Sequence, residues 1–228
     1  MAVNTAAYKN IMQELAVKNA TLVAVSKTKP AEDIQALYDA GQRDFGENYV
    51  QELVDKQAQL PKDIRWHFIG HLQSNKVKYI VPFVHLIHGV DSLKLLLEIN
   101  KQSTKINRTT NCLLQVHIAQ EETKFGFDKN ELDALTEQLV AKSIDTSHVH
   151  IQGLMGMASF TENRQQVTKE FSYLQSLFAD MANKLQNTGH RFNTLSMGMS
   201  ADYAIALEHG SNMVRVGSLL FGERNYHK

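Results

Sequence analysis

Short apolar runs alternate with amphipathic stretches along the chain. Eight of these runs are rich in β-branched residues and have the lengths of buried strands. They cover residues 22–27, 43–47, 65–70, 85–90, 112–119, 149–157, 194–197 and 213–217. The stretches between them place apolar residues at helical spacing, and a further helix over about residues 4–18 precedes the first strand. The pattern therefore predicts strands and helices in regular alternation.

Two of the predicted helices carry strong local signals. The stretch Arg164–Leu185 repeats apolar residues at helical spacing over its whole length. Asp128 followed by Glu131 has the spacing of a capping box, with the aspartate as the N-cap of the helix that follows. Both signals place helices between predicted strands, as the alternation requires.

Eight strands separated by helices predict an α/β fold, a single (β/α)8 TIM-type barrel that spans residues 1–228. The N-terminal helix would cover the place where an eighth helix would pack. The alternative is an open, doubly wound sheet. The barrel is favoured because the strand count reaches eight and no Gly-x-Gly-x-x-Gly turn follows the first strand. The stretch Gly153–Gly156 does not match that glycine pattern.

Composition narrows the class of partner. The chain has 228 residues, 43% of them hydrophobic, and its 24 basic and 24 acidic side chains cancel. We therefore expect no nucleic-acid or membrane surface and a small-molecule partner. The single cysteine, Cys112, lies in an apolar run, which indicates a small buried hydrophobe and a reducing compartment. With no signal-peptide pattern at the N-terminus, we expect a cytoplasmic protein.

Lys27 is the leading candidate for chemistry. It ends the first predicted strand, and Pro30 opens the helix that follows. Ligands bind at the carboxyl ends of strands in barrels and open sheets alike. Partial burial there would lower the pKa of the lysine and free an amine that attacks an aldehyde to give a Schiff base. On spacing alone, a solvated lysine at a strand end is the commoner outcome.

The last two predicted strands point to a phosphate site. Ser200 would cap a helix over residues 201–208, so that backbone amides and a hydroxyl meet at an anion site. The eighth strand ends with Arg215 and Gly217, which share one face, followed by Ser218. Gly217 lets the backbone approach a ligand. The alternative is that Ser200 only caps a helix and Gly217 only lets the chain bend.

A metal site is a further alternative. His148 and His150 share one face of the sixth predicted strand and could ligate zinc. They open that strand, however, and the opening end of a barrel strand belongs to the stability face. We therefore expect no metal.

The polar motifs taken together are similar to those of a known family. They are Ala24–Pro30, Phe45–Tyr49, His67–Lys76, Gly153–Met157, Leu195–Ser200 and Met213–Gly217. In this order they resemble the pyridoxal-phosphate homeostasis protein family, also called the YggS/PROSC family, from about residue 21 to Tyr226. The fold of that family resembles the N-terminal barrel of alanine racemase, which is fold type III among proteins that bind pyridoxal 5'-phosphate (PLP).

The resemblance implies roles for the candidate residues. Lys27 would carry PLP as a Schiff base, and Asn48 would lie near the cofactor. The hydroxyl of Ser200 and the backbone of Gly217 and Ser218 would hold the phosphate. Arg215 would face the pyridine nitrogen, and because arginine keeps its protons the ring would be a weak electron sink. Lys29 and Lys124 match further lysines of the family, and Lys124 is a hypothetical second amine for cofactor transfer.

The function that the resemblance implies is a non-catalytic carrier and buffer in intracellular PLP homeostasis. It would be a monomer that contacts apo PLP enzymes transiently. The alternative is a PLP-dependent, racemase-like enzyme. Racemisation needs acid and base groups on both faces of the substrate, and only Lys27 is evident as such a group; the second domain of alanine racemase has no counterpart after Lys228. The segment before the first strand is shorter than is common in the family, so we expect the first helix to pack differently.

Overall fold

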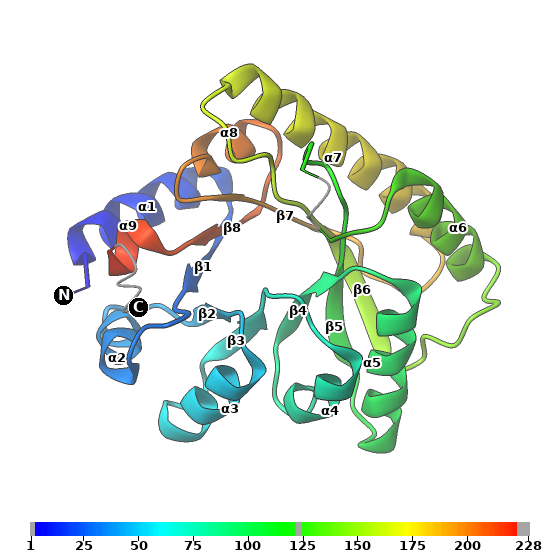
Figure 1. The fold of residues 1–228 in the computed structure, drawn as a ribbon, viewed down its shortest axis with the longest axis horizontal. Coiled ribbons are helices and arrows are strands. Elements are labelled where there is room, and N and C mark those ends of the chain that lie inside the picture. Colours follow the sequence, from blue (N-terminus) through cyan, green and yellow to red (C-terminus); the bar gives the residue numbers. More distant parts are fainter. Residues whose placement is uncertain (1–2, 122–124, 223–228) are drawn as a thin grey trace.

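The computed structural model describes residues 3–121 and 125–222. In these ranges eight parallel strands pair in chain order, and β8 returns to β1 to close the barrel (Figure 1). The strands are β1 (Thr21–Val25), β2 (Asp44–Glu47), β3 (Arg65–Phe68), β4 (Leu86–Val90), β5 (Thr110–Gln115), β6 (Val149–Met155), β7 (Thr194–Met199) and β8 (Met213–Val216). The predicted (β/α)8 barrel is confirmed, and the open sheet is excluded by the pairing of β1 with β8.

The helices form the outer layer around the barrel (Figure 1). They are α1 (Thr5–Lys18), α2 (Ala31–Asp39), α3 (Val50–Gln59), α4 (Val77–Ile80), α5 (Leu93–Lys105), α6 (Lys129–Val140), α7 (Arg164–Leu185), α8 (Tyr203–Glu208) and α9 (Ser218–Phe221). A single 3-10 turn, η1 (Ser74–Lys76), precedes α4. No helix in the described part of the chain is long and apolar enough to span a membrane.

Local signals in the sequence explain several helix boundaries. The capping box at Asp128 and Glu131 opens α6 as predicted, with each side chain accepting from the other residue's backbone amide. The bounds predicted for α7 are those observed. Asn4 caps α1, and its amide donates to the carbonyl of Leu220 in α9. Helix α1 therefore packs beside α9 and β1, at the seam where the barrel closes.

Some predicted strand ends are wrong by one to four residues. The first strand ends at Val25, so that Lys27 lies in the loop that follows. The fifth strand begins at Thr110 and ends at Gln115, well before Ala119. In each case the apolar run continues past the point where the backbone leaves the ladder, because loop residues over the barrel mouth are also partly buried.

Side chains alternate between two environments along the strands, as a closed barrel requires. Outward residues pack under the helices in the main hydrophobic core. Inward residues include a small apolar cluster of Leu86, Leu113 and Met155. Among the polar side chains that the strands bury, hydrogen bonds link Asp44, His67, His88, Ser196 and Arg215. The barrel interior is therefore polar along one path.

Candidate functional site

The ends of β1 and β8 lie side by side at the mouth of the barrel. Their register pairs Val23 with Arg215 and Ala24 with Val216. A Cβ atom on Gly217 would approach the carbonyl oxygen of Val25 to 3.2 Å, so a larger residue there would press on the first strand. The loop that carries Lys27 therefore runs next to the Gly217–Ser218 turn. These two candidate segments are brought together as predicted.

The backbone on both sides of Lys27 is anchored by a polar network. Lys56 Nζ donates to the carbonyl oxygen of Ser26 at 2.8 Å, and the amide of Thr28 donates to Glu52 at 2.6 Å. Thr28 has a φ of 63°, an uncommon value for a residue with a branched side chain. The half-buried Lys27 is therefore held in one place by contacts to both of its neighbours.

The centre of that network is Glu47, the last residue of β2. Its Oε1 accepts from the Ser26 hydroxyl at 2.6 Å and from Lys56 Nζ at 2.7 Å, and Glu47 is fully buried. Burial raises the pKa of Glu47 to about 7, and the charge of Lys56 with both hydrogen bonds offsets part of the rise. The roles of Glu47 and Lys56 were not predicted from the sequence. The pair Glu52 and Lys56, one helical turn apart, was the available signal.

Arg215 is fixed deep in the mouth by three strands. Its Nη1 donates to the carbonyl oxygen and the hydroxyl of Ser196, at 2.9 and 2.7 Å, and its Nη2 donates to the carbonyl oxygen of Gly156 at 3.0 Å. Burial lowers its pKa to about 10, and the carboxylate of Asp202 partly offsets this. The guanidinium thus remains a cation at neutral pH, and its contacts in the described residues are with neutral oxygens.

Ser200 does not cap a helix. The helix α8 begins at Tyr203 with Asp202 as its N-cap residue, and the Asp202 carboxylate accepts from the amide of Met199. Ser200 instead accepts from the amide of Gly217 at 3.2 Å. The predicted cap is wrong because the chain makes a turn after β7, which directs the Ser200 hydroxyl to the end of β8. The meeting of the two loops is nevertheless observed.

Asn48 follows Glu47 at the same rim. Its side-chain Oδ1 is buried and has no hydrogen-bond partner among the described residues. Gly70 lies against its backbone, where a Cβ atom would come within 2.4 Å of the Asn48 carbonyl oxygen. Buried polar atoms without a partner are rare in folded proteins. A bound molecule that offers a polar group at this rim would satisfy the amide.

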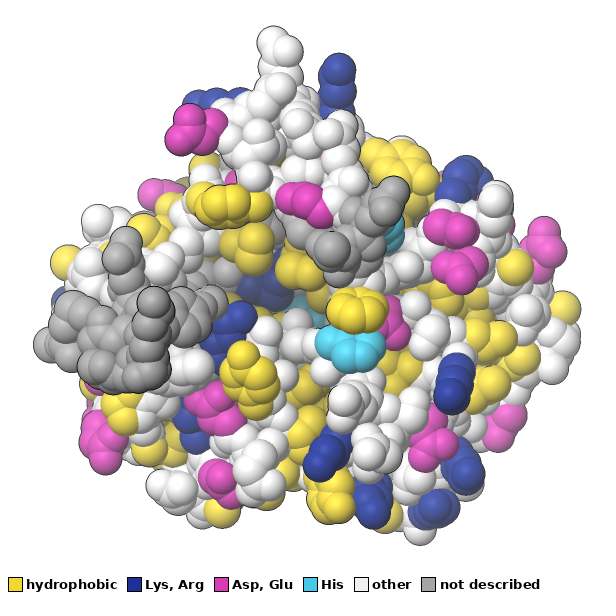
Figure 2. All heavy atoms as spheres, viewed as in Figure 1, with side chains coloured by type: hydrophobic (Ala, Val, Ile, Leu, Met, Phe, Trp, Pro, Cys, Tyr) yellow, Lys and Arg dark blue, Asp and Glu magenta, His cyan; other side chains and the backbone are white. Residues whose placement is uncertain are grey.

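The face of the barrel shown in Figure 2 is hollowed near its centre, and basic and histidine side chains lie there among hydrophobic ones. Apolar side chains are exposed at or beyond the carboxyl ends of several strands: Tyr49 after β2, Phe125 after β5, Met199 at the end of β7 and Leu219 in α9 after β8. Phe125 stacks on His71 with ring centroids 4.2 Å apart. The mouth therefore combines a buried cation with an apolar rim, which suits a flat, anionic molecule.

Of the two further candidate lysines, the structure describes the contacts of Lys29 only. Lys29 Nζ donates to the carbonyl oxygens of Phe221 and Gly222, at 2.7 and 3.4 Å, and so binds the carboxyl end of α9. Lys124 lies outside the described residues. Lys29 thus links the loop after β1 to the carboxyl end of α9.

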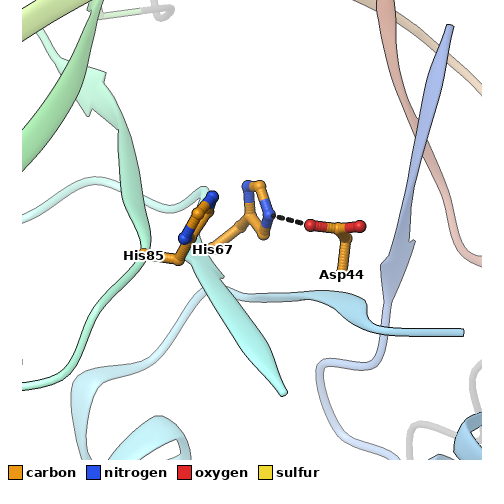
Figure 3. Close-up of side chains that lie close together, drawn as sticks. All are labelled: Asp44, His67 and His85. Carbon is orange, nitrogen blue, oxygen red and sulfur yellow. Dashed lines mark hydrogen bonds and ion pairs between the residues drawn. The ribbon is translucent and has the colours of Figure 1, made fainter. Parts of the chain in front are cut away.

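The histidines considered as zinc ligands face different partners. His148 Nδ1 lies 3.2 Å from the Thr104 hydroxyl, whereas His150 Nε2 accepts from the amide of Arg191 at 2.7 Å. Another group with metal-like spacing is Asp44, His67 and His85, whose ligand atoms lie within 4.8 Å of one another (Figure 3).

That second group is already satisfied without a metal. Both carboxylate oxygens of Asp44 accept from Arg65, and one of them also contacts His67 Nε2 at 3.0 Å. The Arg65 guanidinium beside the carboxylate also disfavours a cation there. Asp44 and His67 therefore belong to a hydrogen-bonded cluster in the barrel interior, whereas His85 is exposed and only its ring lies beside His67.

Comparison with known proteins identifies the family. The family model for the N-terminal domain of alanine racemase matches residues 4–225. The pyridoxal phosphate homeostasis protein of Pasteurella multocida is 40% identical over 220 residues, which cover 94% of this chain and 90% of that protein. The chain belongs to the pyridoxal phosphate homeostasis protein family. The relatives in this family are named for homeostasis and carry no enzyme name.

Solved structures give the same result. PipY of Synechococcus elongatus with PLP bound is 37% identical and superposes with a TM-score of 0.80, covering 90% of this chain and 93% of that one. Alanine racemase of Bartonella henselae, with covalently bound pyridoxal phosphate, is 17% identical with a TM-score of 0.72. It covers all of this chain and 61% of its own, so the likeness to the racemase is one of fold.

Proposed function

We propose that this protein binds PLP through a Schiff base to Lys27 and acts as a non-catalytic carrier and buffer of the cofactor. The observation that carries the proposal is the arrangement of the barrel mouth. An anchored lysine, a buried arginine and a tight Ser200–Gly217 junction lie at the ends of adjacent strands. The PLP bound to a relative at 37% identity supports the choice of ligand.

Each part of the mouth suits a part of the cofactor. The Lys27 amine would attack the aldehyde carbon, and water would leave as the imine forms. The Ser200 hydroxyl and the amides of Gly217 and Ser218 would donate to the phosphate, the hydroxyl exchanging its present contact with Gly217 for the anion. Asn48, whose buried Oδ1 has no partner in the described residues, would contact the ring substituents. Arg215 would face the ring nitrogen.

Arg215 also supports a carrier over an enzyme. An electron sink for amino-acid chemistry works best when the ring nitrogen is protonated. Arginine can donate a hydrogen bond to that nitrogen but gives up its proton with difficulty, and the pKa of Arg215, lowered by burial to about 10, still lies well above neutral. The ring would therefore stay a weak sink, and the Schiff base would serve to store the aldehyde.

Reduction with borohydride tests the covalent site directly. It converts a Schiff base into a stable secondary amine, so that mass spectrometry of the digested protein locates the labelled lysine. We expect the label on Lys27 and its loss in Lys27→Ala, whereas Lys101→Ala, which removes a lysine with a side chain 66% exposed, should be labelled normally. A label that remains at full level in Lys27→Ala would overturn the assignment.

Two further assays test the carrier role. The loaded protein should transfer PLP to an apo enzyme, and the transfer should restore that enzyme's activity. In heavy water the loaded protein should leave the α-proton of amino acids in place. Exchange at enzyme-like rates would instead support the racemase-like alternative. The monomeric state and the cytoplasmic location stay predictions, which size-exclusion chromatography and fractionation would check.

A further inference from the structure

A continuous chain of hydrogen bonds crosses the interior of the barrel. His67 Nε2 lies 3.0 Å from Asp44 Oδ1, and His67 Nδ1 lies 2.9 Å from His88 Nε2. His88 Nδ1 lies 3.2 Å from the Ser196 hydroxyl, which accepts from Arg215 Nη1 at 2.7 Å. The five residues come from five strands, and all of them are buried. The chain therefore joins the opening end of β2 to the arginine in the mouth.

The two ends of the chain fix the direction of every hydrogen bond. A guanidinium can only donate and a carboxylate can only accept. Arg215 therefore donates to the Ser196 hydroxyl, leaving the hydroxyl hydrogen for His88 Nδ1. His88 must then carry its proton on Nε2 and donate to His67 Nδ1. His67 must likewise carry its proton on Nε2 and donate to Asp44, the bond drawn in Figure 3.

In this arrangement each of the four hydrogen bonds has one hydrogen, and both imidazoles are neutral. A second proton on His88 would point at the Ser196 hydroxyl, and that hydroxyl would have to turn away. Charged or titratable groups around His88 oppose the added charge: His67, His85 and Arg215 all lower its pKa, after burial, which lowers it most. The neutral chain is therefore the arrangement that the interior stabilises.

We propose that His67 and His88, each as the Nε2–H tautomer, are positioning residues that aim Arg215 at the ring nitrogen of the bound cofactor. The inference rests on the proposed function for the identity of the ligand. Three of the five guanidinium N–H groups are held by Ser196 and Gly156. The two remaining donors make no hydrogen bond to a described residue, which leaves them for a ligand in the mouth. Every acceptor lone pair in the chain of hydrogen bonds points toward the Arg215 guanidinium, and the chain ends on the Asp44 carboxylate. The chain therefore stabilises the buried cation without a direct ion pair.

The tautomers can be measured on the protein without PLP. Nitrogen-15 spectra of histidine-labelled protein distinguish Nε2–H, Nδ1–H and doubly protonated rings. We expect His67 and His88 as Nε2–H at neutral pH, with assignments made from His67→Gln and His88→Gln. An Nδ1–H tautomer or a doubly protonated ring at either position would overturn the chain. This result does not depend on whether PLP binds.

The effect on Arg215 is tested with PLP itself. Ser196→Ala removes the hydroxyl that links His88 to Arg215, and Ser211→Ala is a matched control. Ser211 is also buried, and its hydroxyl donates to the carbonyl oxygen of Met197 at 2.7 Å without touching the chain. The loss of one hydrogen bond to a charged group should weaken PLP binding by on the order of 10-fold in Ser196→Ala.

A spectroscopic readout separates positioning from general stability. In Ser196→Ala the absorption maximum of bound PLP should shift, because the contact to the ring nitrogen changes. Ser211→Ala should keep the wild-type maximum even if it unfolds at lower temperature. Equal affinities and equal spectra in the two variants would refute the positioning role. If wild-type protein bound no PLP, the proposed function would fail, while the tautomer measurement would still stand.

Discussion

Replacing Lys56 by methionine tests the network that anchors Lys27. Lys56 is 6% exposed, and its Nζ donates to Ser26, Glu47 and Glu52 at 2.6 to 2.8 Å. Methionine fills a similar volume but offers no donor. The fully buried Glu47 would keep only the hydrogen bond from the Ser26 hydroxyl. A buried carboxylate without its cation is strongly destabilising, so Glu47 should take up a proton instead.

The size of the effect depends on pH. In wild-type protein the pKa of Glu47 is about 7, raised by burial, whereas the unfolded value is about 4.3. The folded state therefore binds more protons, and stability falls as pH rises through this window. If the variant keeps Glu47 protonated to about pH 8, it loses about 2.7 kcal/mol between about pH 6 and pH 8, at 1.36 kcal/mol per unit. Wild-type protein, with its midpoint at about 7, loses about half of that, so the difference widens by about 1.4 kcal/mol.

Urea unfolding of both proteins at the two pH values measures this difference. Other titrating groups are common to both proteins and cancel in the comparison. At about pH 8 the total destabilisation should reach about 3 to 5 kcal/mol, the usual cost of breaking a buried ion pair. The double variant Glu47→Gln/Lys56→Met is the control, since it has no carboxylate to titrate. A pH-independent cost in Lys56→Met, equal to that of the double variant, would refute the assignment to Glu47.

Three further predictions concern the rest of the barrel. Burial opposes ionisation of Asp44, but hydrogen bonds from Arg65 and His67 lower its pKa to about 2. Asp44→Asn should therefore cost about 2 kcal/mol at neutral pH, and the cost should vanish in acid unfolding as pH falls through about 2; a cost unchanged in acid would contradict this. Partial burial and the neighbouring His67 lower the pKa of His85 to about 4, but the residue is exposed to solvent, which screens the effect. The melting temperature of wild-type protein should therefore fall only slightly as pH drops from about 6.5 to 4, and His85→Asn should remove that fall. Asp128→Ala removes the cap of α6 and should cost about 1 kcal/mol in urea unfolding; an unchanged midpoint would argue against the capping box.

The strand order and the candidate residues could be predicted because their signals are local. Each strand is an apolar run, and each site motif directly follows a run, so the carboxyl ends of eight parallel strands gather the motifs on one face. The position of Lys27, Arg215 and Gly217 at the barrel mouth follows from that geometry alone. The capping box at Asp128 was predictable for the same reason, since both partners lie within one helical turn.

The predictions failed for side chains whose hydrogen-bond partners lie far away along the chain. Ser200 satisfies the local pattern of an N-cap, yet its hydroxyl accepts from Gly217, which is 17 residues away. The roles of Glu47 and Lys56 were not predicted, because only the fold buries both against the Lys27 loop.

The sequence by itself determined the eight-stranded alternation, the N-terminal helix and the placement of the candidate motifs at the ends of the strands, because periodicity and strand-end position are properties of short segments. Only the tertiary structure decided which side chains form hydrogen bonds with one another in the barrel interior. The contact between His88 and Ser196 joins residues 108 positions apart, and it exists because closing the barrel brings inward faces of distant strands together. No local pattern distinguishes an inward polar residue that completes such a chain from one that faces water.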